Sequence, residues 1–220
     1  MKKHVIIVAG GSGVRMNSDI PKQFQNVNGI PVLFYTLKCF DRYIKGIPII
    51  LVLPEPYIEY WKSITKKNKF DYPHKIIKGG ENRFFSVKNG LSLIEEPGLI
   101  AIHDGVRPLV SQETLHRVFL KAEKEGNAVP AISIAESMRN IETGISKPVN
   151  RDLFRLIQTP QCFHSELVKR AYEQNYREKF TDDASVVEVL GIKINLVEGN
   201  PENIKITRPS DLKYAEALLK

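Results

Sequence analysis

Residues 5–16 read VIIVAGGSGVRM, and this stretch decides the expected fold. Its first four residues are all β-branched, which is typical of a strand buried on both faces of a parallel sheet. The glycines that follow directly let backbone N–H groups approach an anion. The stretch therefore predicts a buried strand that ends in an anion-binding loop.

Four more short apolar runs repeat this strand pattern along the chain. They cover residues 48–53, 75–77, 99–102 and 128–132. Helical spacing of apolar residues lies between or after them, over 87–94, 115–122 and 212–219. Ser111 stands where it can cap the second of these helices. The alternation favours an α/β fold with a doubly wound, mostly parallel sheet of the Rossmann-like kind.

Residues from about 131 to 158 interrupt this alternation. Short alternating pieces at 132–134 and 153–156 surround a polar turn at 142–144, which predicts a β-hairpin arm projecting from the sheet. Exposed strand edges are usually covered, so either a partner subunit covers the arm or the arm folds back on its own domain. Because no repeat or linker divides the chain, residues 1–220 are expected to form a single domain.

Charge and cysteine content narrow the class of protein. Lys and Arg number 32 and Asp and Glu 25, and the resulting charge of +7 suits nucleic acid, an anionic membrane, a small polyanion or simple solubility. Motifs for base stacking or groove reading and long apolar runs are absent from the sequence, so we expect neither nucleic acid nor membrane as a partner. Two cysteines without a Cys/His cluster argue against zinc and favour a reducing, cytoplasmic location.

Spacing tests three interpretations of the glycine loop. A Walker A loop would end in Gly-Lys-Ser/Thr, which this loop lacks. A dinucleotide-binding loop needs a small residue where Met16 stands and an acidic residue about 20 positions further on, at the end of a second strand. This sequence does not meet these requirements, so both interpretations fail. Arg15 and Lys22 instead place a cation at each end of the loop, which suits a nucleoside triphosphate. The alternative is a tight glycine turn with solvated cations.

Six segments, in order, carry a resemblance to a known family. They are residues 9–16 with 21–23, then 79–87 (GGENRFFSV), 103–108 (HDGVRP), 156–161 (LIQTPQ), 181–185 (TDDAS) and 202–207 (ENIKIT). Together they resemble the cytidylyltransferases, specifically the 2-C-methyl-D-erythritol 4-phosphate cytidylyltransferases of isoprenoid-precursor synthesis. Gly10 also fits the related ribitol-5-phosphate cytidylyltransferases, whereas Asp183 favours the methylerythritol family. Ribitol 5-phosphate therefore remains an alternative substrate.

The resemblance implies a Rossmann-like nucleotidyltransferase that joins CTP and 2-C-methyl-D-erythritol 4-phosphate to give CDP-methylerythritol and pyrophosphate. A nucleotide-binding module without turnover is the other alternative. The attacking phosphate is largely a dianion at pH 7, so the reaction needs no general base. The implied catalytic residues are Arg15 and Lys22, which stabilise the transition state, while Asp104 would help to hold Mg²⁺ or a similar divalent cation.

The resemblance also divides substrate binding among the motifs. The residues implied for CTP are Ala9, Gly10, Gly11, Gly13, Gly80, Ser86 and Asp104. Those implied for the sugar phosphate are Arg107, Ser137, Arg151, Thr159, Thr181 and Lys205. Because Arg151 lies on the expected arm, the resemblance implies a homodimer in which Arg151 reaches the neighbouring site. Thr181 is in addition placed to cap the helix that follows it.

Overall fold

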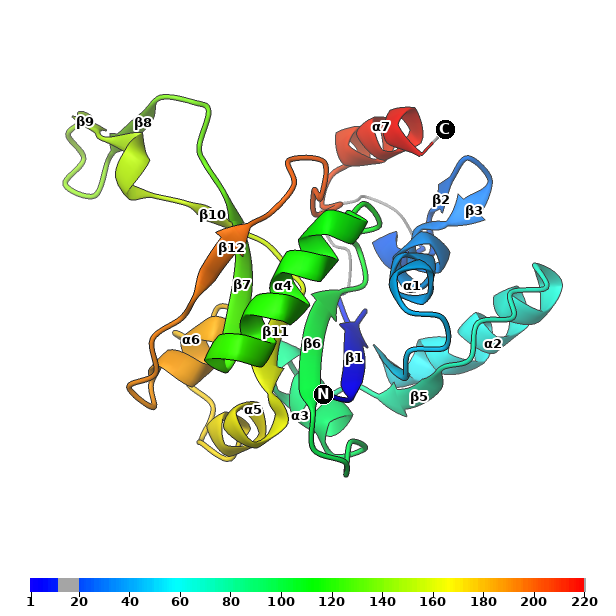
Figure 1. Cartoon of the computed structure of the whole chain (residues 1–220). Helices are drawn as coiled ribbons and strands as arrows, with labels where there is room; N and C mark the ends of the chain where they lie inside the picture. Colours follow the sequence, from blue (N-terminus) through cyan, green and yellow to red (C-terminus); the bar gives the residue numbers. More distant parts are fainter. Residues whose placement is uncertain (12–19, 220) are drawn as a thin grey trace.

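The computed structural model describes residues 1–11 and 20–219. Within these residues an eight-stranded sheet has the strand order β10-β7-β11-β6-β1-β4-β5, and β12 pairs with β7 (Figure 1). The strands of this sheet are β1 (Lys3–Val8), β4 (Ile49–Leu53), β5 (Lys75–Lys78), β6 (Leu99–Asp104), β7 (Asn127–Ile132), β10 (Leu156–Ile157), β11 (Gln161–His164) and β12 (Leu196–Glu198). All five strands expected from the apolar runs are among them.

The sheet is mostly parallel, as expected. Strand β1 pairs in parallel with both β4 and β6, and β4 pairs in parallel with β5. Strand β11 inserts antiparallel between β6 and β7. The residues of β5 are only partly buried because β5 forms an edge of the sheet, so the expectation of burial on both faces is wrong for this strand.

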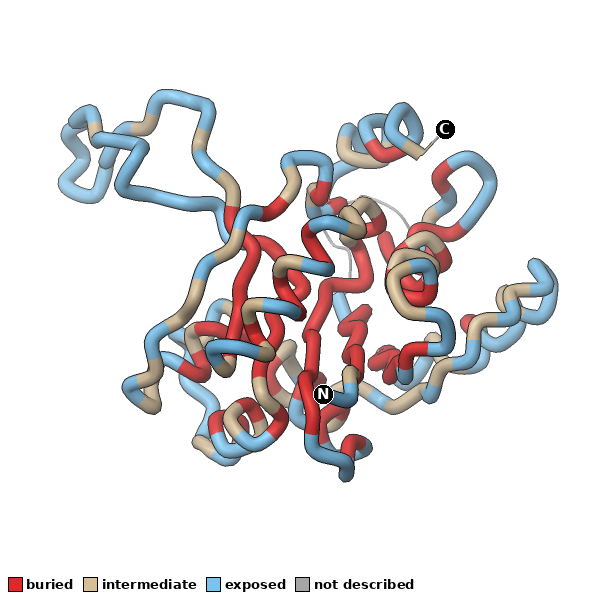
Figure 2. Tube along the Cα trace, in the orientation of Figure 1, coloured by how far each residue is buried: buried red, intermediate tan, exposed pale blue. Residues whose placement is uncertain are grey.

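Helices cover both faces of the sheet, and the core shows as buried strands through the middle of the molecule (Figures 1 and 2). Val5 and Ile7 of β1 belong to the core under α1 (Val32–Tyr43), α2 (Ile58–Lys67) and α4 (Gln112–Glu125). Ile6 and Val8 belong to the core under α3 (Arg83–Leu91), α5 (Ser165–Tyr172) and α6 (Asp183–Glu188). Successive side chains of a strand point to opposite faces, so a strand covered on both sides reads as a continuous apolar run.

The three expected helices are present as α3, α4 and α7 (Pro209–Leu218). Ser111 caps α4 as expected, because its hydroxyl oxygen accepts the N–H of Thr114 at 3.1 Å. Helix α3 begins at Arg83, earlier than the apolar spacing indicated, because the side chain of Asn82 caps it. Ile94 lies beyond the end of α3 but is buried.

A hairpin made by β8 (Met138–Asn140) and β9 (Lys147–Val149) projects from the body of the molecule (Figure 1). The expected turn is correct, and the two expected pieces pair antiparallel through Ile132 and Leu156 where the arm joins the sheet. The strands next to the turn are β8 and β9, which were not expected. The arm carries exposed apolar side chains, with Ile141 71% and Leu153 79% exposed.

The remaining short elements precede α1, precede α2 or lie on the arm. They are η2 (Lys22–Phe24), β2 (Asn26–Val27), β3 (Ile30–Pro31), η3 (Glu55–Tyr57) and η4 (Arg151–Leu153). Helix α7 packs through Ala215 on a small cluster that includes Val27 and Ile206. Among the helices of residues 1–11 and 20–219, none has both the length and the apolar content needed to cross a bilayer.

Candidate active site

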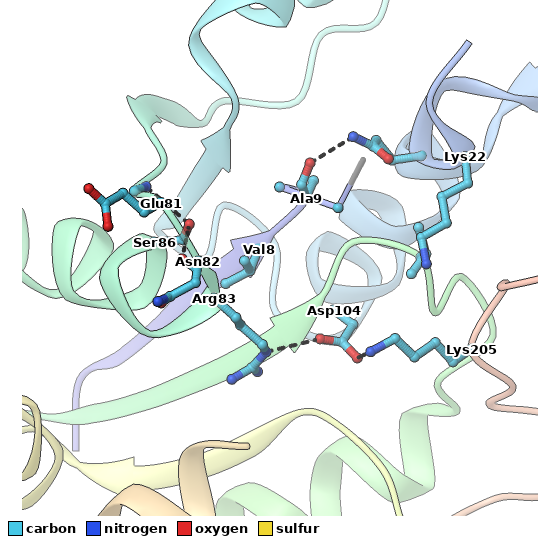
Figure 3. A pocket seen from close by; sticks show the side chains of 14 residues that line it. Val8, Ala9, Lys22, Glu81, Asn82, Arg83, Ser86, Asp104 and Lys205 are labelled. Carbon is cyan, nitrogen blue, oxygen red and sulfur yellow. Dashed lines mark hydrogen bonds and ion pairs between the residues drawn. The ribbon is translucent and has the colours of Figure 1, made fainter. Parts of the chain in front are cut away.

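A cavity of about 290 Å³ lies at the carboxyl ends of β1 and β6 (Figure 3). Its lining residues are Val8, Ala9, Gly10, Gly11, Lys22, Gln23, Gly80, Glu81, Asn82, Arg83, Ser86, Asp104, Val106 and Lys205. Ligands of open α/β sheets bind at this edge. Eight residues that the sequence predicted for the site are therefore brought together here: Ala9, Gly10, Gly11, Lys22, Gly80, Ser86, Asp104 and Lys205.

The loop after β1 forms one wall of the cavity. Gln23, which is 1% exposed, donates from Nε2 to the carbonyl oxygen of Ala9 at 2.8 Å and so ties η2 to this loop. A Cβ built on Gly11 would lie 3.5 Å from Cε of Lys22, an ordinary contact. Lys22 thus lies directly beside the glycine loop. Gly13 and Arg15, also predicted for the site, lie outside the described residues.

The start of α3 forms a second wall. The N–H of Gly80 donates to the hydroxyl oxygen of Ser86 at 3.1 Å, and that hydroxyl donates to the carbonyl oxygen of Asn82 at 2.8 Å. A Cβ on Gly80 would lie 2.3 Å from Cβ of Phe85, so only glycine fits this close approach. The hydroxyl of Ser86 therefore fixes the backbone that precedes the helix.

Asp104, at the end of β6, is surrounded by three cations. Its carboxylate lies 2.9 Å from Nζ of Lys205 and 3.5 Å from Nε of both Arg83 and Arg107. Burial alone would raise the pKa of Asp104, but the three positive charges, that of Arg83 first, outweigh burial and hold the pKa well below its usual range. Asp104 is therefore ionised at neutral pH.

A buried chain of hydrogen bonds through Thr159 and His103 holds the backbone of Asp104 in place. The hydroxyl of Thr159 accepts the N–H of Asp104 at 3.1 Å and lies 3.0 Å from Nδ1 of His103. Nε2 of His103 lies 3.0 Å from the carbonyl oxygen of Arg107, so Nε2 carries the proton and Nδ1 accepts from Thr159. Burial lowers the pKa of His103 to about 4, which keeps the ring neutral. Both hydrogen-bonding roles of the Thr159 hydroxyl are thus used inside the protein.

Two predicted sugar-phosphate residues lie away from the cavity, on the arm. Ser137 precedes β8 and is exposed, and Arg151 begins η4 and is exposed as well. The guanidinium of Arg151 donates to the carbonyl oxygen of Ala135 within the arm. Neither residue lines the cavity described above.

Thr181 is exposed and does not cap α6, so that prediction is wrong. Asp182 is the N-cap residue: its carboxylate accepts the N–H of Ser185 at 2.9 Å, while the Ser185 hydroxyl accepts the N–H of Asp182 at 3.2 Å. An ionised carboxylate is a strong acceptor at the positive end of a helix dipole, which favours Asp182 for this position.

Arg107 lies beside the cavity, where its Nη1 donates to the carbonyl oxygen of Asn203 at 2.7 Å.

Sequence reasoning missed Arg83 and Gln23 as residues of the cavity. Arg83 lies within the segment that carried the family resemblance, but its partner Asp183 is 100 positions away. No spacing rule joins two residues so far apart, so only their positions in the fold reveal the pair. Gln23 adjoins Lys22, and its buried amide could have been found only by asking what binds the carbonyl of Ala9.

Of the two carboxylates that line the described cavity, Glu81 and Asp104, Asp104 is the one that contacts cations. The described part of the chain contains no group of three or more His, Cys, Asp or Glu side chains placed to hold a metal ion. Mg²⁺ is usually held by one or two carboxylates together with substrate phosphates and water. The ionised Asp104 at the cavity wall fits that kind of shared site and not a site made by the protein alone.

Comparison with known proteins places the chain in a family. Residues 3–220 match the 2-C-methyl-D-erythritol 4-phosphate cytidylyltransferase family. Over 219 residues and the full length of each chain, the protein is 49% identical to the enzyme of this name from Bacteroides thetaiotaomicron and 50% identical to that from Bacteroides fragilis. It is similar, at a TM-score of 0.83 and 30% identity, to a crystal structure of the 4-diphosphocytidyl-2C-methyl-D-erythritol synthase of Anaerococcus prevotii, covering 99% of this chain and 95% of that one. The chain therefore belongs to the 2-C-methyl-D-erythritol 4-phosphate cytidylyltransferase family.

Proposed function

We propose that this member of the family joins CTP and 2-C-methyl-D-erythritol 4-phosphate in the cavity at the ends of β1 and β6. A phosphate oxygen of the sugar phosphate attacks the α-phosphorus of CTP, a new P–O bond forms, and pyrophosphate leaves with the electrons of the broken bond. The observation that carries the proposal is the convergence of Lys22, Lys205 and Asp104 on one cavity whose wall is a glycine loop. The full-length identity to the methylerythritol enzymes favours this substrate over ribitol 5-phosphate.

The chemistry asks the protein to bring two anions together. The sugar phosphate has its second pKa near 6 and needs no base at pH 7. Fixed cations that meet the charge developing on the α-phosphate therefore supply the catalysis. We assign this role to Lys22, which lies beside the glycine loop, and to Arg15 by its motif.

Backbone groups and one hydroxyl would hold the nucleotide. Support comes from Gly10 and Gly80, which both line the cavity beside the hydroxyl of Ser86. Ala9 and Gly11 line the same cavity, and Gly13 belongs to the same motif. A small pocket with backbone donors and acceptors suits a pyrimidine better than a purine.

Lys205 and Arg107 would bind the sugar phosphate near Asp104. Their support is that both cations already contact the Asp104 carboxylate, which a substrate phosphate could replace as their partner. Thr159 contributes through the buried chain below Asp104. Thr181 remains a proposal from its motif alone.

A homodimer would bring Ser137 and Arg151 to a neighbouring site. The projecting arm and its exposed Ile141 and Leu153 support this proposal, since exposed apolar side chains on an arm favour a covering partner. We therefore treat residues 131–158 as the dimer contact of a single 1–220 domain.

A divalent cation such as Mg²⁺ would be held by Asp104 together with the phosphates of CTP. When bound, it would neutralise negative charge on the triphosphate. The protein contributes an ionised carboxylate whose position is fixed by its N–H bond to Thr159 and by its neighbouring cations. Two free cysteines suit a reducing cytoplasm, which is the location we propose.

Pyrophosphate release tests the reaction. The purified chain is incubated with CTP, Mg²⁺ and either 2-C-methyl-D-erythritol 4-phosphate or ribitol 5-phosphate. We expect release only with the first, and a loss of at least about a hundredfold in Lys22→Met, by analogy with other preorganised charge stabilisers. CTP binding without release would leave a nucleotide-binding module, and release only with ribitol 5-phosphate would change the assigned substrate.

Mixing two inactive variants tests the role of Arg151. One variant carries Arg151→Ala and the other Lys22→Met. If Arg151 serves the partner's site, a mixed dimer keeps one complete site, and random mixing restores about a quarter of the wild-type activity. No recovery after subunit exchange, or a monomer by light scattering, would refute the shared site.

A further inference from the structure

A partly buried ion pair joins the cavity wall to a helix that does not line the cavity. Nη1 and Nη2 of Arg83 donate to the two carboxylate oxygens of Asp183 at 2.7 and 2.6 Å. The hydroxyl of Tyr172 donates to the same carboxylate at 2.6 Å. Asp183 is fully buried, and a two-point pair of this kind is both strong and directional.

Three of the five N–H donors of the Arg83 guanidinium face protein carboxylates. Each terminal nitrogen donates to Asp183, and Nε lies 3.5 Å from the Asp104 carboxylate. Figure 3 shows Arg83 and Asp104 facing each other. An arginine in a phosphate-binding cavity would ordinarily be taken for a phosphate ligand. Here the two-point pair with Asp183 and the contact with Asp104 hold the guanidinium in one orientation, which suits a supporting role.

Asp183 is itself fixed to the sheet. Gln161 of β11, which is 1% exposed, donates from Nε2 to the carboxylate of Asp182 at 2.8 Å. Its Oε1 accepts the N–H of Ala184 at 2.8 Å. The two bonds flank Asp183, so the first turn of α6 cannot shift without breaking contacts to the sheet.

Because Arg83 is bonded to Asp183, it also restrains the cavity wall formed by residues 80–86. It is the first residue of α3 and follows directly after Asn82, whose carbonyl oxygen accepts from Ser86 and whose side chain caps the helix. Ser86 in turn holds the N–H of Gly80. A displacement of Arg83 would therefore move the backbone that faces the nucleotide.

We propose that Arg83 and Asp183 are positioning residues that fix the Gly80–Ser86 wall and the Asp104 carboxylate for CTP. The ion pair connects the start of α6 to both groups at once. This inference rests on the proposed function, because it assigns the wall to CTP. It adds two residues that act through Gly80, Ser86 and Asp104 and do not touch the substrate.

Calorimetric titration of CTP in the presence of Mg²⁺ tests the proposal in Arg83→Lys and Asp183→Asn. Lys keeps the positive charge but cannot make the two-point pair. We expect each variant to raise the Kd for CTP about tenfold, within the range for residues that couple through others. The double variant should raise the Kd no more than the worse single variant, because both changes break one interaction.

Asp41→Asn supplies the matched control. Asp41 is a carboxylate, 8% exposed, that pairs with Lys45 at 2.9 Å and accepts the N–H of Gly46 at 3.0 Å, but it lies on α1 outside the cavity. This variant should lower the melting temperature without changing the Kd for CTP. If Asp183→Asn does not fold, Arg83→Lys alone decides.

Two results would overturn the inference. One is a Kd within twofold of wild type in folded Arg83→Lys and Asp183→Asn. The other is a rise in Kd for Asp41→Asn that matches theirs at the same loss of melting temperature, since that would reflect general destabilisation. A wild-type chain that neither binds nor turns over CTP would instead refute the proposed function, and this inference with it.

Discussion

Gly80→Ala is expected to displace the cavity wall that we assign to the nucleotide. A Cβ on Gly80 lies 2.3 Å from Cβ and 2.9 Å from the carbonyl carbon of Phe85. Carbon atoms in contact prefer about 3.5–4.0 Å, so the methyl group would be at least about 1.2 Å too close. Both contacted atoms are fixed by the backbone of α3, so no side-chain rotation relieves the clash.

The cost follows from that displacement. Relief moves Gly80 by about 1 Å and breaks its 3.1 Å hydrogen bond to Ser86. Adding a methyl group to a packed region costs about 1–3 kcal/mol. A shift of about 1 Å at a binding site costs about a hundredfold in rate. We therefore expect Gly80→Ala to lower the free energy of unfolding by about 1–3 kcal/mol. We also expect it to lower kcat/KM for CTP about a hundredfold.

Urea unfolding and pyrophosphate release measure the two effects. Gly10→Ala is the control for stability, because a Cβ there would lie 3.7 Å from the Ser86 hydroxyl oxygen, an ordinary contact. It should leave the free energy of unfolding within about 0.5 kcal/mol of wild type. If Gly80→Ala unfolds at the same urea concentration as wild type and keeps its kcat/KM within twofold, the steric reasoning is refuted.

Two further changes test the buried polar groups. Thr159→Val should lower the free energy of unfolding by about 2–4 kcal/mol in urea, because it leaves the N–H of Asp104 and Nδ1 of His103 unpaired, whereas Thr159→Ser should recover most of that loss. His74 accepts the indole N–H of Trp61 at 2.8 Å, and burial lowers its pKa, so its contribution to stability is complete above pH 6.5 and is lost as pH falls through the lowered pKa. Fluorescence of Trp61, the one tryptophan in the sequence, should change over that range in wild type, and an unchanged response in His74→Gln would contradict this assignment.

Continuous apolar runs predicted the central strands of the sheet, because a strand that is buried on both faces has apolar residues at every position. The run over 48–53 is β4, and both of its faces are covered by helices. Strands β11 and β12 were not predicted, since their mixed residues become strands only by pairing with β6 and β7. The arm was predicted, but its strands lie nearer the turn than the alternation indicated.

Motifs predicted the residues that line the cavity better than they predicted the buried hydrogen bonds that hold those residues in place. Lys22, Asp104 and Lys205 come from segments that the family resemblance singled out, and the fold brings them to one cavity. The resemblance could not show that the hydroxyl of Thr159 forms hydrogen bonds with His103 and with the N–H of Asp104. A hydrogen-bond partner depends on three-dimensional distance, which residue spacing along a chain does not contain.

The ion pair between Arg83 and Asp183 has a consequence for synthesis on the ribosome. Its two members are separated by 100 positions. At about 5–20 residues per second, the growing chain carries Arg83 for about 5–20 s before Asp183 is made. During that interval the start of α3 has no carboxylate from α6 to hold it. If the pair positions the proposed CTP site, nascent chains should gain full CTP affinity only after they have extended beyond α6.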